Sequence, residues 1–347
     1  MPGFRVLRSA AGAALALAAA PAACSNAGES LGVSVQPTGI VNVGVYLDRD
    51  GSHTFTTLDT VFAGARVALL LRGSQDTLRT MASLATGFAR FDAVPVGEYT
   101  VAVAASSIGD SIQVAAIDSG NIRLSASDPN HNVLVRLGYP EVSIRAARAL
   151  PQGRRVFIRG VIEAGLQAFR DTTSYVADSS GQIRLTRVSL AGGRAGNNPG
   201  DSVRALGTMS ARAGQPTLDL AVMTTVASGP APVPVDLHTA TAATANGGVL
   251  DAGLVRLLSN ALILDTMSVP PPDFQDFQMH VDDGTGTLTV YIDRTFLDDL
   301  NVSRTVFCPG NSLTIARGVL VPDAAGAWML KPRAGLNGEI RLLATCP

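Results

Sequence analysis

The sequence predicts an all-β protein of about three small domains behind an export leader. Short runs of Val, Leu, Ala and Thr are interrupted about every ten residues by Gly, Pro, Asn or Asp, and sustained helical periodicity is nearly absent. The length of 347 residues allows two or three domains of roughly 100–150 residues each. Hydrophobic residues make up 46% of the chain, which is enough to form cores and excludes a disordered protein.

Residues 1–24 have the features of a secretory leader. Two arginines precede an Ala/Leu run that is too short to span a bilayer. Small residues directly before Cys24 resemble the lipobox of bacterial lipoproteins, although Pro21 stands where that family usually carries Leu. The resemblance implies that Cys24 is lipidated after cleavage; ordinary cleavage nearby is the alternative. Because Ser25 follows the cysteine instead of Asp, we expect an exported protein, either anchored to the outer membrane or released into the periplasm or outside.

With Cys24 lipidated, Cys308 and Cys346 remain as an even pair. An exported protein folds in an oxidising compartment, so we predict that these two cysteines form a disulfide. A metal site is the alternative, but no further ligand residues lie near either cysteine in the sequence.

After a linker at 25–37, residues 38–139 are predicted to form the first domain. The motif GFARFDAVPVGEYTVAV at 87–103 predicts two strands joined by a Pro-Gly turn into a hairpin, and AGARVALLL at 63–71 supplies the preceding strand. These segments resemble the transthyretin-like or B-type repeats of bacterial surface proteins and carboxypeptidase regulatory domains. The resemblance implies a β-sandwich that serves as a spacer or stalk.

An acidic loop in this domain has the spacing of a calcium-binding loop. Its oxygen-bearing residues occupy alternate places and the twelfth place of such a loop: Asp48, Asp50, Ser52, Thr54 and Asp59. Calcium prefers several hard oxygen ligands on a tight loop. Asp59 replaces the longer Glu that usually ends the loop, and Gly51 lies two places early. Two interpretations stay open, a weak calcium site and a solvated turn.

Residues 141–227 and 236–347 contain a degenerate internal repeat, separated by a proline-rich linker at 228–235. Each copy has a long first strand, a hairpin around an Asp-x-x-Gly turn, a strand entered through Pro-Gly, and a last strand. The matched segments are 154–165 with 254–263, 174–185 with 279–292, 199–207 with 309–318, and 214–223 with 326–332. Asp178 and Asp283 are equivalent in the two turns. Five strands with a connection after the third predict a small closed barrel in each copy.

Both copies resemble OB-fold domains of the tRNA-anticodon type. The second copy keeps a short helix after the third strand, at 294–300 with Asp293 as its N-cap, whereas the first has a Gly/Asn-rich loop at 191–200. The resemblance implies nucleic-acid binding through a stacking aromatic and an arginine. The equivalent positions hold Thr173 and Ala177 in the first copy, and Gln278 and Asp282 in the second. The stacking, worth about 1–3 kcal/mol per base, is therefore missing.

The two barrels carry opposite charge. Residues 141–234 contain eleven arginines and six acidic residues, a net +5, whereas residues 235–347 have a net charge of −5. Alternation predicts that Arg159 and Arg184 leave the first barrel while Ile158 and Ile183 fill it. The candidate polyanion face comprises Arg159, Tyr175, Arg184, Arg187 and Arg204. A solvated arginine-rich surface is the alternative, and a face covered by the second barrel would favour a scaffold.

Motifs for catalysis are absent from the sequence. The four histidines do not have metal-ligand spacing, and no Gly-x-Ser-x-Gly, phosphate-binding glycine loop or Ser-x-x-Lys occurs. We therefore expect no enzyme and no cofactor apart from the calcium hypothesis.

The leading hypothesis is a non-catalytic cell-surface binding or scaffold lipoprotein. Its barrels would contact an unidentified envelope component, polyanion or protein, and it would touch the membrane through the lipid anchor only. The alternatives are an extracellular nucleic-acid-binding module accessory to a nuclease, and a purely structural envelope protein.

Overall fold

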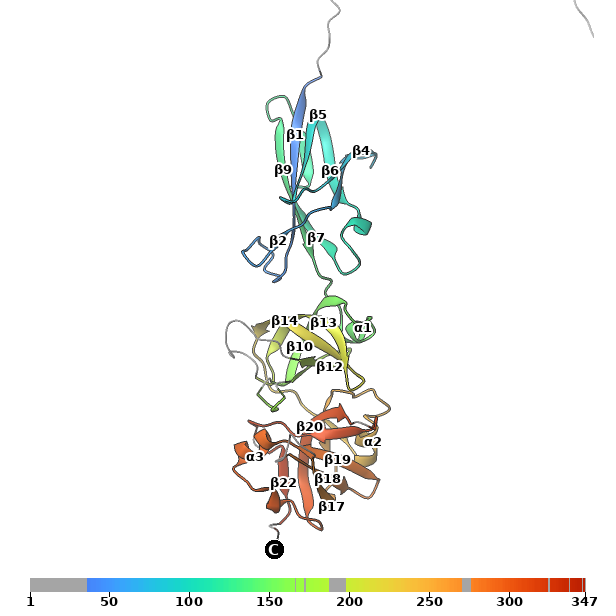
Figure 1. Cartoon of the computed structure of the whole chain (residues 1–347), viewed down its shortest axis with the longest axis vertical. Coiled ribbons are helices and arrows are strands. Elements are labelled where there is room, and N and C mark those ends of the chain that lie inside the picture. Colours follow the sequence, from blue (N-terminus) through green and yellow to red (C-terminus); the bar gives the residue numbers. More distant parts are fainter. Residues whose placement is uncertain are drawn as a thin grey trace, which may run out of the picture.

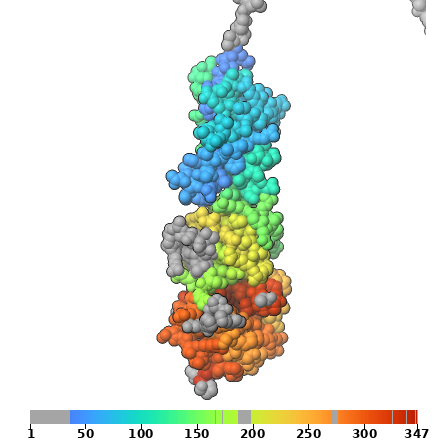
Figure 2. Space-filling model, in the orientation of Figure 1, coloured from blue at the N-terminus to red at the C-terminus, as the bar shows by residue number. Residues whose placement is uncertain are grey.

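The computed structural model describes residues 36–165, 167–171, 173–186, 198–269, 276–323, 325–336, 338–344 and 346. Three domains follow one another along a rod, with the first domain at one end and the C-terminus at the other (Figure 1, Figure 2). Strands make up most of the regular structure, which confirms the all-β class. The leader, Cys24 and nearly all of the 25–37 linker lie outside the described residues. Within the described part, no helix is long and apolar enough to cross a membrane.

The first domain is a sandwich of two sheets over one hydrophobic core. In the first sheet, the central strands are parallel: β1 (Thr38–Leu47) and β9 (Asn130–Gly138). Its other strands are β2 (Thr60–Val61), β5 (Phe88–Pro95) and β7 (Gln113–Asp118). The second sheet comprises, in order, β4 (Thr77–Ala82), β3 (Arg66–Leu71), β6 (Gly97–Val103) and β8 (Asn121–Leu124); η1 (Ala105–Ser107) follows β6. Val43, Phe91 and Val101 are among the side chains that point inward.

The predicted hairpin at 87–103 is wrong, although both of its strands are present. β5 pairs with β1 in the first sheet, whereas β6 pairs with β3 and β8 in the second. The chain therefore crosses between sheets instead of folding back along itself. The buried Tyr99 hydroxyl holds this corner by donating a hydrogen bond to the Pro95 carbonyl at 2.7 Å. In a sandwich, buried and exposed side chains alternate along the strands of both sheets. Alternation alone therefore cannot distinguish a hairpin within one sheet from a connection between the two sheets.

The first barrel has the strand order of an OB-type barrel. Its five strands close in the order β10-β11-β12-β14-β13, with β12 and β14 parallel. The elements are α1 (Ile144–Arg148), β10 (Arg155–Ala164), β11 (Ser174–Asp178), β12 (Gly181–Thr186), β13 (Ser202–Arg212) and β14 (Gln215–Ala227). Ile158 and Ile183 fill the interior, as alternation predicted. Most of the loop expected at 191–200 lies outside the described residues.

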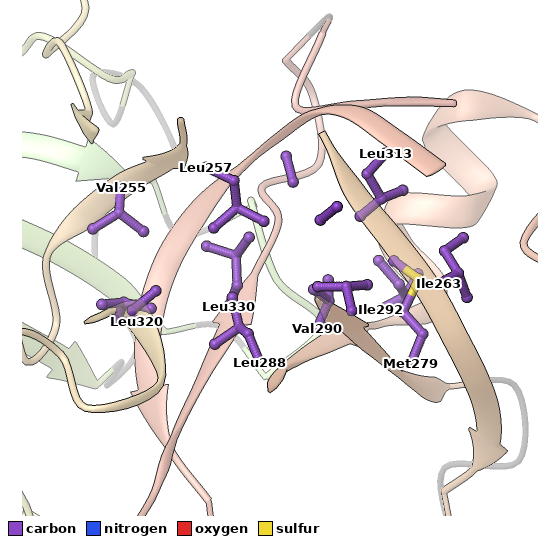
Figure 3. Packing of buried hydrophobic residues seen from close by; sticks show 14 of the residues in the cluster. Val255, Leu257, Ile263, Met279, Leu288, Val290, Ile292, Leu313, Leu320 and Leu330 are labelled. Carbon is purple, nitrogen blue, oxygen red and sulfur yellow. The ribbon is translucent and has the colours of Figure 1, made fainter. Parts of the chain in front are cut away.

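The second barrel repeats this order with additions. Pairings run from β17 through β18, β19, β21 and β20 back to β17, with β19 and β21 parallel. The strands are β15 (Val235–Leu237), β16 (Leu254–Leu257), β17 (Ala261–Ser268), β18 (Phe277–Asp282), β19 (Thr287–Ile292), β20 (Ser312–Pro322), β21 (Trp328–Lys331) and β22 (Ile340–Leu342); the helices are α2 (Thr239–Ala243), α3 (Arg294–Leu300) and η2 (Arg304–Val306). Ile263, Val290 and Leu330 meet in its core (Figure 3).

The helix predicted in the second barrel is present, but the long first strand is not. Asp293 caps α3 by accepting a hydrogen bond from the backbone N–H of Phe296. The segment 254–263, expected as one strand, is divided into β16 and β17 because Ser259 and Asn260, residues typical of turns, interrupt it.

The repeated hairpin aspartates have the same role in both barrels. Asp178 accepts the backbone N–H of Ile144, the first residue of α1, at 2.9 Å. Asp283 accepts the hydroxyl of Thr239, the first residue of α2, at 2.7 Å and its backbone N–H at 3.3 Å. Each turn thus satisfies free donors at the start of the short helix that precedes its barrel. Burial alone would raise the pKa of Asp283, but hydrogen bonds from Thr285 and its other partners hold it well below its ordinary value.

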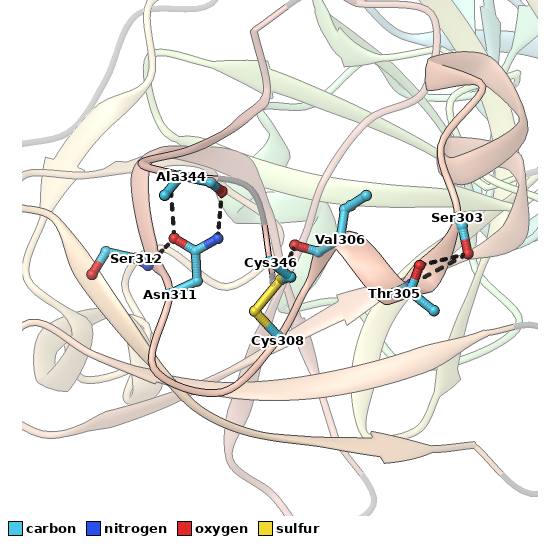
Figure 4. The surroundings of a disulfide bond; sticks show 8 residues. All are labelled: Ser303, Thr305, Val306, Cys308, Asn311, Ser312, Ala344 and Cys346. Atoms are coloured by element: carbon cyan, nitrogen blue, oxygen red, sulfur yellow. Dashed lines mark hydrogen bonds between the residues drawn. A yellow bond between two sulfur atoms is a disulfide. The ribbon is translucent and has the colours of Figure 1, made fainter.

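The predicted disulfide closes the end of the rod. Cys308 and Cys346 are joined with a Cα–Cα distance of 6.0 Å across 38 residues of sequence (Figure 4). Close by, the Asn311 amide donates to the Ala344 carbonyl at 2.6 Å. The last described residues are therefore attached to the second barrel by a covalent bond as well as hydrogen bonds.

Candidate functional site

The two barrels meet at an interface with an apolar cluster at its centre, which we call the seam. Phe169 and Tyr175 pack edge to face with ring centroids 5.7 Å apart, and both are at most 2% exposed. The seam cluster contains Ala164, Ala168, Phe169 and Tyr175 from the first barrel, and Ala252, Leu254, Val319 and Val321 from the second. This packing resembles the interior of a domain more than a contact between independent domains.

Asp251, in the loop before β16, connects both barrels at one edge of the seam. Its carboxylate accepts hydrogen bonds from Arg148 of α1 at 2.7 Å and from Gln215 of β14 at 2.7 Å. A third donor, the Trp328 indole of β21, lies at 2.9 Å. Asp251 is 7% exposed, so this carboxylate is buried but satisfied by donors from both barrels.

Lys331, the only lysine, is a second connection across the seam. Its ammonium lies 3.4 Å from Asp171 of the first barrel and 3.7 Å from Asp293 of the second. It also lies 4.6 Å from the centre of the Phe169 ring, within the range of a cation–π contact. Burial alone would raise the pKa of Asp171, but the Lys331 charge and hydrogen bonds from Thr173 hold it below its ordinary value.

A third connection is a buried group of one guanidinium and two carboxylates. Arg333 binds both carboxylate oxygens of Glu339, at 2.9 and 2.7 Å, and also donates to the backbone carbonyl of Glu163 in the first barrel. Glu163, Arg333 and Glu339 are 7%, 5% and 2% exposed. Burial raises the pKa of Glu163 to about 7, against the opposing effects of Arg333 and a backbone hydrogen bond from Leu254.

Two members of the predicted polyanion face lie at the seam. Tyr175 is fully buried there, and the Arg184 side chain is 17% exposed with its guanidinium 3.9 Å from Asp171. Arg184 does leave the barrel interior, as alternation predicted, but the second barrel covers it. Both residues line a cavity of about 180 Å³ together with Tyr291 and Lys331.

The other members do not continue this surface. Arg159 and Arg204 both contact Glu141, with the Arg204 Nε 2.7 Å from its carboxylate. Burial alone would raise the pKa of Glu141, but the two arginines hold it below its ordinary value. Arg187 lies outside the described residues. The described members of the candidate polyanion face are therefore divided between the seam and an ion-paired junction.

A further cavity lies at the seam. It has a volume of about 410 Å³, and its walls come from both barrels: Gln167 and Asn198 on one side, Thr295 and Asp299 on the other. The Asp299 carboxylate accepts the backbone N–H of Gly335 at 2.9 Å. The described walls carry amide, hydroxyl and carboxylate groups.

The acidic loop of the first domain brings three of its predicted ligands together. Asp48, Asp50 and Asp59 each place one carboxylate oxygen within 4.8 Å of the others. Ser52 and Thr54 are exposed, and the Ser52 hydroxyl donates to the Thr54 carbonyl at 3.0 Å. Three hard carboxylates match the chemistry that calcium prefers.

Other groups of the protein already contact these carboxylates. Asp48 accepts the backbone N–H of Gly51 at 2.6 Å, and Asp59 accepts that of Thr56 at 2.7 Å. The Arg136 guanidinium lies 3.5 Å from Asp48 and would compete with a cation for it. The loop is thus able to fold on its own hydrogen bonds, and both interpretations from the sequence stay open.

The same loop docks onto the first barrel. The Gly51 carbonyl accepts a hydrogen bond from Arg204 at 3.3 Å, while the Arg204 guanidinium lies 3.6 Å from the centre of the Phe157 ring. Gly51 has φ +72°, and a Cβ there would overlap Arg204 and lie 2.9 Å from Phe157. A side chain at this position would be strained by the backbone conformation and would displace Arg204 and Phe157.

Sequence reasoning did not identify Asp251, Lys331, Glu163 or Arg333 as interface residues. They come from a loop, two strands and a post-strand segment that have no common spacing. The opposite net charges of the two barrels were a partial signal, because the Arg148–Asp251 pair follows them whereas the Lys331–Asp171 pair has the reverse polarity.

No protein-family model matches this chain, and no curated protein matches it. Among solved structures, it is similar to the hypothetical protein YgiW from E. coli (20% identity, TM-score 0.22, covering 26% of this chain and 98% of that one). It is also similar to a murine DNA-binding protein bound to double-stranded DNA (10%, 0.31, covering 55% and 99%). A third is the major pilin SpaD from Corynebacterium diphtheriae (12%, 0.23, covering 40% and 37%). Similarity at this level carries no argument about function.

Proposed function

We propose that this chain is a non-catalytic, exported scaffold protein whose three β domains form one stiff spacer. The observation that carries the proposal is the burial of Tyr175 and Arg184 beneath the second barrel. Strands two and three form a ligand-binding face in OB-type barrels, and in the first barrel these strands are β11 and β12. Here that surface supports a neighbouring domain.

The seam supports stiffness because separating it would be costly. Opening it would expose the Phe169–Tyr175 pair to water and separate Arg148 from Asp251. Because the apolar seam cluster would be exposed to water at the same time as the Arg148–Asp251 and Lys331–Asp171 pairs separate, the joint favours the closed state.

The junction of the first domain with the first barrel supports the same proposal. Arg155 lies 4.7 Å from the centre of the Tyr139 ring, and Arg154 lies 3.6 Å from Asp110. Together with the Arg204–Gly51 hydrogen bond, these contacts join the two domains on more than one side.

The finer features of the proposal come from the sequence. A transthyretin-like first domain would act as the stalk, and lipidation of Cys24 would anchor the protein in the outer membrane. The second barrel would then stand farthest from the membrane, where it meets an envelope component or another protein.

Small-angle X-ray scattering on the full mature chain tests the spacer. We expect one maximum dimension that matches the extended rod and does not change with salt. A control is the variant Arg148→Ala combined with Lys331→Ala, which should broaden the distribution of distances. A wild-type ensemble as broad as the variant's would reject the proposal.

Nucleic-acid binding is tested on the same protein. Protein binding to a polyanion releases counterions and weakens with added salt. We expect no binding of single-stranded DNA at low salt, because the missing stacking residues and the covered face leave no platform for bases. Salt-sensitive binding would instead favour the nucleic-acid-binding module.

The clustering of Asp48, Asp50 and Asp59 favours a calcium-binding role as a second candidate. Calorimetric titration of the mature chain with calcium tests it, with Asp59→Asn as the ligand variant and Asp76→Asn as the control. Heat that is lost only in Asp59→Asn would support the site. No heat and no change in melting temperature at millimolar calcium would leave the solvated turn.

A further inference from the structure

The buried group at the seam contains more negative than positive charge. Glu163 and Glu339 each contribute a carboxylate, whereas Arg333 is the one cation that binds them among the described residues. All three side chains are less than 9% exposed. With both carboxylates ionised, the group would hold a net charge of −1 away from water, which is energetically costly.

Arg333 is committed to Glu339, so Glu163 is left under-satisfied. Two of the Arg333 nitrogens bind the Glu339 carboxylate, and the third donates to the backbone carbonyl of Glu163 instead of its side chain. One backbone N–H, from Leu254 of the second barrel, reaches the Glu163 carboxylate. Its Oε2 is buried without a hydrogen-bond partner among the described residues.

Other charged groups of the second barrel have their own partners. Lys331 contacts Asp171 and Asp293. Arg256 forms an ion pair with Asp236, whose pKa it and Arg317 lower. The backbone N–H of Arg317 donates to the Glu339 carbonyl, but no ion pair joins Arg317 to Glu163 among the described contacts.

We propose that the closed seam holds one proton on Glu163, and that loss of this proton loosens the joint between the two barrels. The seam would thereby make the stiffness of the rod depend on pH. This inference concerns the joint itself and holds whether or not the protein acts as a spacer.

The direction of the pH dependence follows from the pKa of Glu163, which burial raises from 4.5 to about 7 in the closed seam. An acid with a raised pKa stabilises the closed state fully below its ordinary pKa, and this stabilisation is lost as the pH rises toward the raised value. The seam should therefore loosen between about pH 4.5 and 7. Asp293, whose pKa burial also raises, acts in the same direction.

Hydrogen exchange on the full mature chain tests the proposal. Two of the amides that cross the seam serve as probes: that of Leu254, which donates to Glu163, and that of Ala334, which donates to the Ala168 carbonyl at 3.0 Å. After correction for the intrinsic rate, we expect their protection to fall on the order of 100-fold from pH 5 to pH 8. Glu163→Gln should show little of this pH dependence, because the glutamine side chain is neutral over the whole pH range.

The exposed Glu98→Gln serves as the matched control and should behave as the wild type. Glu339→Gln provides a second variant in case Glu163→Gln does not fold. It leaves Arg333 free to neutralise Glu163, so its seam protection should also become nearly independent of pH. Equal pH dependence in the wild type and both seam variants would overturn the proposal, as would an infrared spectrum showing Glu163 ionised at pH 5.

Discussion

Arg148 of the first barrel donates a hydrogen bond to Asp251 of the second at 2.7 Å, across 103 residues of sequence. The Asp251 carboxylate also accepts donors from Gln215 and Trp328, so three segments converge on one buried acceptor. A shared acceptor of this kind couples the two barrels, because a movement of one relative to the other breaks hydrogen bonds to this carboxylate.

We expect Asp251→Ala to destabilise the tandem barrels by about 3–5 kcal/mol, the usual effect of removing one partner from a buried ion pair. The loss would be measured by urea unfolding monitored through Trp328, the only tryptophan, which contacts Asp251 directly. Asp236→Ala is the control, because its partner Arg256 is solvent-exposed and the lost stability should be much smaller. Equal losses in the two variants would contradict the role of Asp251.

Gly51→Ala should loosen the junction between the first domain and the first barrel. The added methyl group would overlap the Arg204 guanidinium and separate it from the Gly51 carbonyl. Gly64→Ala is a matched control, since Gly64 also has a positive φ of +83° but nothing within 4 Å of its Cβ position. Both variants carry the conformational cost, roughly 1–2 kcal/mol. Only Gly51→Ala should raise the rate of proteolysis between residues 138 and 142, and similar cleavage of both would refute the contact.

Local chemistry explains which parts of the fold the sequence could predict. The equivalence of Asp178 and Asp283 was visible because each lies in a short turn whose residues have fixed spacing, and both have the same role in the structure. Alternation likewise placed Ile158 and Ile183 inside the first barrel. The sequence did not show which strands pair with each other. β5 and β6 have the pattern of a hairpin, but they pair with strands of different sheets.

The seam could not be predicted for a related reason. The Arg184 side chain points out of the first barrel, as the alternation along a strand requires. Alternation predicts which side chains point outward, but it does not predict what covers them. Whether water or a second barrel covers an outward residue depends on contacts such as Arg148–Asp251, which join distant segments.

Removal of the disulfide should destabilise the second barrel without changing its fold. The Cys308–Cys346 bond closes a loop of 38 residues, and a bond of this span contributes about 2–4 kcal/mol, mainly by restricting the unfolded chain. We expect Cys308→Ala with Cys346→Ala to lower the melting temperature to the value of the wild type in a reducing agent. A reductant-induced shift that persists in the double variant would show that another bond is responsible.

Asp283→Asn should weaken the start of α2 in a manner that depends on pH. The Asp283 carboxylate accepts hydrogen bonds from Thr239 and Thr285, and their removal or weakening should cost about 1–2 kcal/mol near neutral pH. The pKa of Asp283 lies well below its ordinary value. This stabilisation is therefore fully present when the pH is above the ordinary pKa of an aspartate, and it is lost as the pH falls from there toward the lowered pKa. The stability difference between wild type and variant should therefore narrow below about pH 4. Asp298→Asn, at an exposed carboxylate paired with Arg294, is the control, and an equal pH trend there would contradict the assignment to Asp283.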